Sequence, residues 1–147
     1  MPGYKPTPQF IKNSAYSDRC VDLEGGVNTA PLIGFGLHRG ENQRFTFHSL
    51  GGKDYNISVL TASLHPTNVL SQNPAAGDKV KTSDVDKSVY QVEKNNGYWY
   101  ISIKGADGYR LYWTLKNEAS ITRITLERAD NSPTQAWSLL DTDLVQR

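Results

Sequence analysis

Polar side chains gather in the segment FGLHRGENQRFTF, residues 35–47, just before a pair of alternating aromatic residues. His38, Asn42 and Gln43 supply an imidazole and two amides, and the carboxylate of Asp22 stands in the preceding apolar run, CVDLEGG. A sugar binds well where a charged acceptor takes hydrogen bonds from two adjacent hydroxyls, each contributing about 1.5–3 kcal/mol, and a ring covers its C–H face. These two segments therefore hold the three kinds of group that a sugar site requires, namely a carboxylate, a ring and an amide.

Glycines and strand alternation define the expected surroundings of this set. Gly34, Gly36 and Gly40 carry no side chain and are expected to leave space for a pyranose ring, with the backbone N–H of Gly40 as a further donor. Asp22 alternates with two apolar neighbours, so we expect it on the exposed face of a strand. Glu24 is expected on the same face, where it either assists or faces water.

Two residues compete to supply the ring. Ile33, Phe35 and Leu37 share one face of the predicted strand, and three such residues together are typical of a core. His38 lies on the opposite face and offers both a ring and a hydrogen bond if the apolar face is buried. The choice between Phe35 and His38 stays open.

Composition excludes several functional classes. Sixteen basic and fifteen acidic residues in 147 give a net charge of +1, so no clustered positive charge favours nucleic acid. Cys20 is the only cysteine, which rules out an intramolecular disulfide and a CxxC zinc pair. The chain has no Gly-x-Ser-x-Gly, His-Glu-x-x-His or phosphate-loop motif, so we expect no enzyme, no metal and no cofactor.

Targeting signals point in the same direction. The first residues, MPGYKPTPQ, contain no apolar run, and no stretch of 18 apolar residues follows. We therefore expect no signal peptide, no membrane insertion and a cytoplasmic location, with secretion that needs no signal peptide as the alternative.

Two periods describe the fold. Apolar residues recur at spacing two between turn-forming residues, which predicts an all-β domain of about a dozen short strands covering residues 1–147. A longer period relates Phe45, Tyr90 and Trp137, which are 45 and 47 residues apart, and stepping back 34, 33 and 34 residues reaches Ile11, Ile57 and Ile103. The chain therefore divides into three repeats of four strands, at about 9–52, 53–96 and 97–143.

This pattern resembles the ricin B-type lectins. Gln43-Arg44-Phe45 and Gln135-Ala136-Trp137 match the family's Gln-x-aromatic ending, and PLIGFGLHRGENQ is similar to small cytoplasmic lectins of mushrooms. The sequence differs from the family pattern at Phe45 and Tyr90, which replace a tryptophan. It also differs in the second repeat, where Ser88 replaces the glutamine. The resemblance implies a β-trefoil with pseudo-threefold symmetry. It also implies an agglutinin-like lectin for glycans that end in galactose or N-acetylgalactosamine, with homodimers as one arrangement.

The resemblance also assigns residues. Asp22 matches the aspartate that accepts from two sugar hydroxyls, Asn42 matches the neighbouring amide, and Phe35 matches the stacking aromatic. Gln43 recurs as Gln135 in a repeat without the other groups, which indicates that it braces the fold. The second and third repeats lack the aspartate and the asparagine, so one sugar site per chain is expected.

A protease inhibitor is the alternative function. β-Trefoils of this size also inhibit proteases through an exposed rigid loop. Arg19, Lys53, Lys116 and Arg128 lie near predicted turns, and the segments HPTN and NSPT are braced by proline. Inhibition would survive the loss of Asp22 and Asn42, whereas sugar binding would not.

Overall fold

The computed structural model describes residues 7–142, which form antiparallel strands and three short 3₁₀ turns. The strands are β1 (Gln9–Asn13), β2 (Arg19–Leu23), β3 (Leu32–Gly36), β4 (Phe45–Gly51), β5 (Asp54–Leu60), β6 (Pro66–Leu70), β7 (Lys81–Ser83), β8 (Tyr90–Asn95), β9 (Tyr98–Lys104), β10 (Arg110–Thr114), β11 (Thr122–Arg123), β12 (Thr125–Arg128) and β13 (Trp137–Asp141). The 3₁₀ turns are η1 (Glu24–Gly26), η2 (Glu41–Gln43) and η3 (Pro133–Gln135). Within residues 7–142, no helix has the length and hydropathy needed to cross a membrane.

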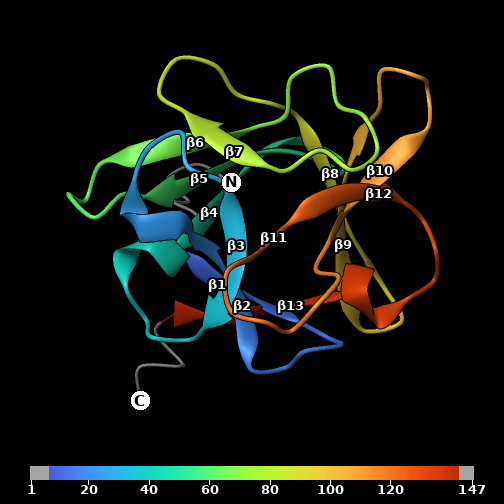
Figure 1. Cartoon of the computed structure of the whole chain (residues 1–147). Helices are drawn as coiled ribbons and strands as arrows, with labels where there is room; N and C mark the ends of the chain where they lie inside the picture. The colour runs from blue at the N-terminus through green and yellow to red at the C-terminus, as the bar shows by residue number, and fades with distance from the viewer. Residues whose placement is uncertain (1–6, 143–147) are drawn as a thin grey trace.

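Six strands close into a barrel. β1 pairs with β13, and the ring continues through β9, β8, β5 and β4 back to β1. The hairpins β2–β3, β6–β7 and β10–β12 are spread around the barrel (Figure 1). Pairing of β11 with β3 and two single bridges tie the hairpins to one another. The predicted all-β trefoil is confirmed.

Strands β1–β4, β5–β8 and β9–β13 form three similar groups along the chain. The third group has five strands rather than four because its last hairpin arm is divided into β11 and β12 at Ile124. Residue 143, the predicted end of the third repeat, lies outside the described residues.

Aromatic side chains fill the centre of the barrel. Phe45, Tyr90 and Trp137 each open the last barrel strand of their group, and each is fully buried. The ring of Trp113 meets that of Tyr90 edge to face, with centroids 5.6 Å apart. Such rings bury large apolar areas, so the long-period aromatics are core residues rather than ligand contacts.

One anchor of the predicted repeat is displaced by two residues. Ile11 pairs with Leu139, Ile57 with Phe47, and Ile101 with Val92, so the third equivalent isoleucine is Ile101. It is fully buried, whereas the predicted Ile103 is only partly buried. Ile101 stands 36 residues before Trp137 rather than 34, and a strand places residues two apart on the same face. The spacing rule therefore could not separate the two.

Candidate functional site

Asp22 on β2 is the centre of a polar cluster in the first repeat. Its Oδ1 accepts a hydrogen bond from Nδ2 of Asn42 at 3.0 Å, and its Oδ2 accepts from Nε2 of Gln43 at 2.9 Å. Nε2 of His38 lies 3.1 Å from the same Oδ2. The predicted exposure of Asp22 is wrong, since the residue is only 2% exposed. The period-two pattern of β2 predicts only which residues share a face of that strand. It does not show that the segment after β3 folds over this carboxylate.

Gln43 holds that segment in place. Its Oε1 accepts from the backbone N–H groups of His38 and Arg39, at 3.0 and 3.2 Å. Besides its bond to Asp22, its Nε2 donates to the carbonyl of Gly36 at 2.8 Å. The side chain is fully buried at the end of η2, so these bonds satisfy an otherwise costly amide. Gln43 thus ties the turn after β3 to the carboxylate on β2.

The imidazole of His38 lies between Asp22 and solvent. Its Nδ1 accepts the backbone N–H of Gly40 at 3.0 Å, so in the neutral ring Nε2 carries the proton and donates to Asp22. The His38 side chain is 42% exposed, compared with 3% for the side chain of Asp22. His38 is therefore a partly exposed cover over a buried acceptor.

Burial sets the electrostatics of the cluster. It raises the pKa of Asp22 above its ordinary value of 3.8, against the opposing effects of the hydrogen bond from Gln43 and the charge of His38. Glu24 adds a smaller repulsion in the same direction as burial. A carboxylate in this position is stable only with its donors in place.

The three glycines expected to clear space differ in their surroundings. A Cβ on Gly34 would lie 2.8 Å from Leu115, and one on Gly40 would lie 2.7 Å from the His38 ring. Only Gly36 has room for a Cβ, whose nearest neighbour, Nη1 of Arg19, would lie at an ordinary contact distance of 3.8 Å. The expectation that Gly40 offers a free N–H is also wrong, because that group donates to His38.

Phe35 and His38 lie side by side instead of on opposed faces. Their rings meet edge to face with centroids 5.9 Å apart, and Phe35 is partly buried. Of the predicted core face, Ile33 is 2% exposed but Leu37 is 38% exposed. The structure therefore brings both candidate rings to the same edge of the cluster.

Glu24 departs from its predicted place. Strand β2 ends at Leu23, and Glu24 begins the turn η1 rather than continuing the face of Asp22. Gly25 and Gly26 both have positive φ, a conformation that glycine tolerates best. This backbone conformation does not continue the strand.

The third repeat contains the same brace with a different centre. Nε2 of Gln135 donates to the carbonyl of Arg128 at 2.8 Å and to Oγ1 of Thr114 at 3.2 Å. Its Oε1 accepts the N–H of Asp130. Thr114 thus occupies the position of Asp22, which sequence reasoning did not identify. The signal was available, because Thr114 and Asp22 both stand 21 residues before their glutamines.

Groups suited to catalysis are scattered. Nε2 of His48 lies 2.9 Å from Oγ of Ser58 on the barrel surface, but within residues 7–142 no acid orients this imidazole. Cys20 is buried, and burial raises the pKa of its thiol to about 11, which makes it a poor nucleophile. In the part of the chain that the structure describes, no group of three histidine, cysteine or acidic residues could hold a metal ion.

Comparisons with known proteins identify the fold. No protein-family model and no curated protein matches the sequence. ThreeFoil, a designed threefold-symmetric protein, matches the structure with a TM-score of 0.77 at 15% identity over 91% of this chain and 98% of its own. The Rhizoctonia solani agglutinin matches with a TM-score of 0.74 at 20% identity over 96% and 99%. The chain has the fold of the ricin B-like lectins.

A further match comes from the ricin B-like lectin of Macrolepiota procera, whose structure contains lactose. It has a TM-score of 0.71 at 18% identity and covers 95% of this chain and 98% of its own. The TM-scores establish a shared ricin B-like fold, and at these low identities a functional assignment must come from the residues of the site.

Proposed function

We propose that this protein is a lectin that binds glycans ending in galactose or N-acetylgalactosamine, through one site in the first repeat. The observation that carries the proposal is the carboxylate of Asp22, buried beneath a partly exposed imidazole and beside an amide. The third repeat has a threonine at this position and the second repeat has no glutamine brace. The lactose-containing structure of a protein with the same fold supports this sugar class.

The acceptor capacity of Asp22 fits two adjacent hydroxyls. An ionised carboxylate has about four acceptor positions. Protein donors use one position on Oδ1 and two on Oδ2, the second of these being taken by His38. Rotation of His38 would leave one position on each oxygen, which is what a pair of neighbouring hydroxyls requires. Because His38 is partly exposed, its rotation costs little packing.

The remaining groups of the sugar-binding set surround the same point. Asn42 is fixed by its Nδ2, which donates to Asp22 and to the carbonyl of Leu23. Among residues 7–142 no group donates to its Oδ1, which is therefore available to a sugar hydroxyl. Phe35 and His38 provide a ring wall for the C–H face of the pyranose, and Gly36 leaves the approach open.

One small site implies weak binding of a single sugar. A dissociation constant of about 1 mM, or about −4 kcal/mol, is the expected range for a monosaccharide. Strong attachment to a glycan surface then needs several sites, and a homodimer would supply the second.

Calorimetric titration with methyl β-galactopyranoside tests the proposal directly. Asn42→Ala should weaken binding about tenfold, since a hydrogen-bonding amide is lost from the site. Thr134→Ala is the matched control because Thr134 precedes Gln135 as Asn42 precedes Gln43, and it should bind like the wild type. Equal binding by both variants, or no binding by the folded wild type, would contradict the proposal. In the second case trypsin and papain inhibition would be measured next.

A further inference from the structure

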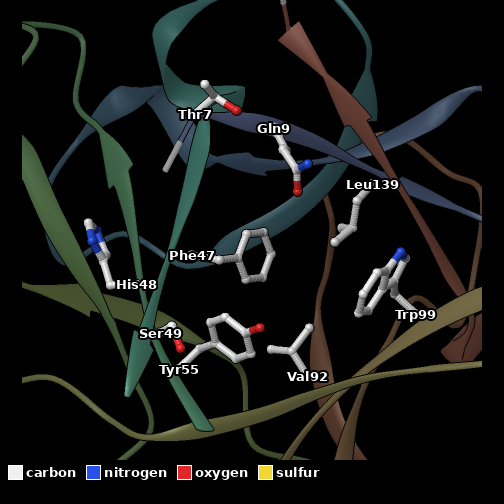
Figure 2. Close-up of a pocket in the computed structure, with 9 residues that line it drawn as sticks. All are labelled: Thr7, Gln9, Phe47, His48, Ser49, Tyr55, Val92, Trp99 and Leu139. Atoms are coloured by element: carbon white, nitrogen blue, oxygen red, sulfur yellow. The ribbon is translucent and has the colours of Figure 1, made fainter. Parts of the chain in front are cut away.

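We propose that the cavity at the open end of the barrel is a second ligand site, and that it takes a neutral saccharide. The cavity has a volume of about 720 Å³ and is lined by residues of all six barrel strands (Figure 2). This volume lies in the range of small-molecule sites. None of the lining residues within 7–142 belongs to the cluster around Asp22.

The cavity follows from the threefold construction of the barrel. The hairpins pair with the far ends of β5 and β9, which leaves the ends that carry Tyr55 and Trp99 uncovered by them. Each group of strands contributes one matching pair of lining residues: Gln9 and Phe47, Tyr55 and Val92, Trp99 and Leu139, and β4 adds His48 and Ser49. Two residues further along β1, β5 and β9 stand Ile11, Ile57 and Ile101, which are fully buried in the core.

Aromatic rings and one amide face each other across the cavity. Figure 2 shows Phe47 and Tyr55 on one side and Trp99 on the other, with the Gln9 amide pointing between them. The rings of Phe47 and Tyr55 meet edge to face with centroids 6.3 Å apart. Gln9, Tyr55 and Trp99 occupy the same position in the three repeats, and of these three residues Gln9 alone is not aromatic. The threefold pattern is thus broken by a hydrogen-bonding group.

The polar atoms of this layer lack protein partners. Across residues 7–142, the side-chain amide of Gln9, the hydroxyl of Tyr55 and the indole N–H of Trp99 form no hydrogen bond with the protein. They lie beside apolar surface from Phe47, Val92 and Leu139. The cavity therefore offers donors, an acceptor and flat apolar faces at the same time.

These groups select the ligand class. Among the described residues that line the cavity there is no aspartate, glutamate, lysine or arginine, so a charged ligand would lose hydration without meeting an opposite charge there. A wholly apolar ligand would cover Gln9, Tyr55 and Trp99 and leave their polar atoms unpaired. A neutral pyranose satisfies both conditions, because its C–H face can lie on a ring while its hydroxyls bond to the amide.

Indole N–H signals in ¹H–¹⁵N NMR spectra of the full chain provide the test. Of the three tryptophans, Trp113 and Trp137 are fully buried, so the signal of Trp99 reports on the cavity. The probes are the methyl pyranosides of glucose, mannose and galactose, with methyl glucuronide as the charged probe and indole as the apolar probe. Because Trp99 lies outside the first-repeat site, its signal tests the cavity whether or not that site binds galactose.

We expect at least one neutral glycoside to shift the Trp99 signal with a dissociation constant of about 1–10 mM, and the glucuronide and indole to bind at least about tenfold more weakly. Gln9→Ala should weaken the neutral glycoside about tenfold. Gln91→Ala, a partly buried glutamine on β8 outside the cavity, is the matched control and should bind like the wild type. Unshifted Trp113 and Trp137 signals show that each variant is folded.

Three results would overturn the proposal. They are a Trp99 signal that no neutral glycoside shifts, tighter binding of indole or glucuronide than of every neutral glycoside, and wild-type affinity in Gln9→Ala.

Discussion

The first and third repeats close on the same glutamine but place different groups beneath it. Gln43 and Gln135 each donate to the carbonyl seven residues before them and accept from the N–H five residues before them. The third partner is a carboxylate, Asp22, in the first repeat and a hydroxyl, Thr114, in the third. The two repeats therefore share the glutamine's hydrogen bonds to the backbone, but they differ in the side chain that the glutamine contacts.

This difference separates architecture from function. A buried carboxylate costs free energy that its donors must offset, and the first repeat supplies three of them from His38, Asn42 and Gln43. Thr114 completes the same brace with one hydrogen bond from its glutamine and no buried charge. A carboxylate is thus unnecessary for the brace, and under the function proposed above Asp22 adds the ability to accept hydrogen bonds from a ligand.

Removing the two glutamines should give the largest difference in stability. Gln43→Ala should lower the free energy of unfolding by about 3 kcal/mol, because it also leaves a buried carboxylate with one donor fewer. Gln135→Ala should cost about 2 kcal/mol, since it orphans only neutral groups. Urea unfolding at neutral pH measures both. An equal cost at the two positions would show that the carboxylate does not depend on its brace.

Exchanging the centres should give the next largest effect. Thr114→Asp should destabilise the fold by about 2 kcal/mol, because Asp130 and Thr134 stand where the first repeat has His38 and Asn42. The reverse change, Asp22→Thr, should cost about 1 kcal/mol or less, since threonine already serves in the third repeat. The same urea series reports both values. A larger loss for Asp22→Thr than for Thr114→Asp would contradict the comparison.

The pH dependence of stability should give the smallest effect. Burial raises the pKa of Asp22, so the folded state holds its proton to higher pH than the unfolded state does. The contribution to stability is present below the ordinary value of 3.8 and is lost as pH rises through the raised value. Compared with Asp22→Asn, the wild type should therefore lose stability as pH rises over this window. A difference between the two proteins that does not change with pH, or changes in the opposite sense, would show that Asp22 does not titrate in this way.

Sequence patterns predicted the fold and much of the cluster for identifiable reasons. Aromatic residues at a period of about 45 located the three barrel strands that begin at Phe45, Tyr90 and Trp137. Their polar character within one repeat predicts a common site for Asp22, His38 and Asn42, and the structure brings them together. The family resemblance rested on these residues and on the glutamine that holds them.

Other features depend on contacts that a linear pattern does not contain. Alternation in β2 placed Asp22 outward, whereas burial came from a turn 16 to 21 residues further along. The cavity at the barrel end also has a signal in the sequence: Gln9, Tyr55 and Trp99 are 46 and 44 residues apart, at one position of the long repeat. Period-two alternation shows that such residues share a face but does not show that the barrel leaves that face open.

A glycan array probed side by side with the wild type and Asp22→Asn tests the central claim most directly. Asparagine keeps the shape of aspartate but removes the charge, and urea unfolding would first show that the variant is folded. We predict that the wild type binds glycans with terminal galactose or N-acetylgalactosamine and that the variant loses at least about tenfold of that binding, as expected when charge-assisted hydrogen bonds are lost. Equal binding of the same galactose-terminated glycans by both proteins would contradict a site built on Asp22.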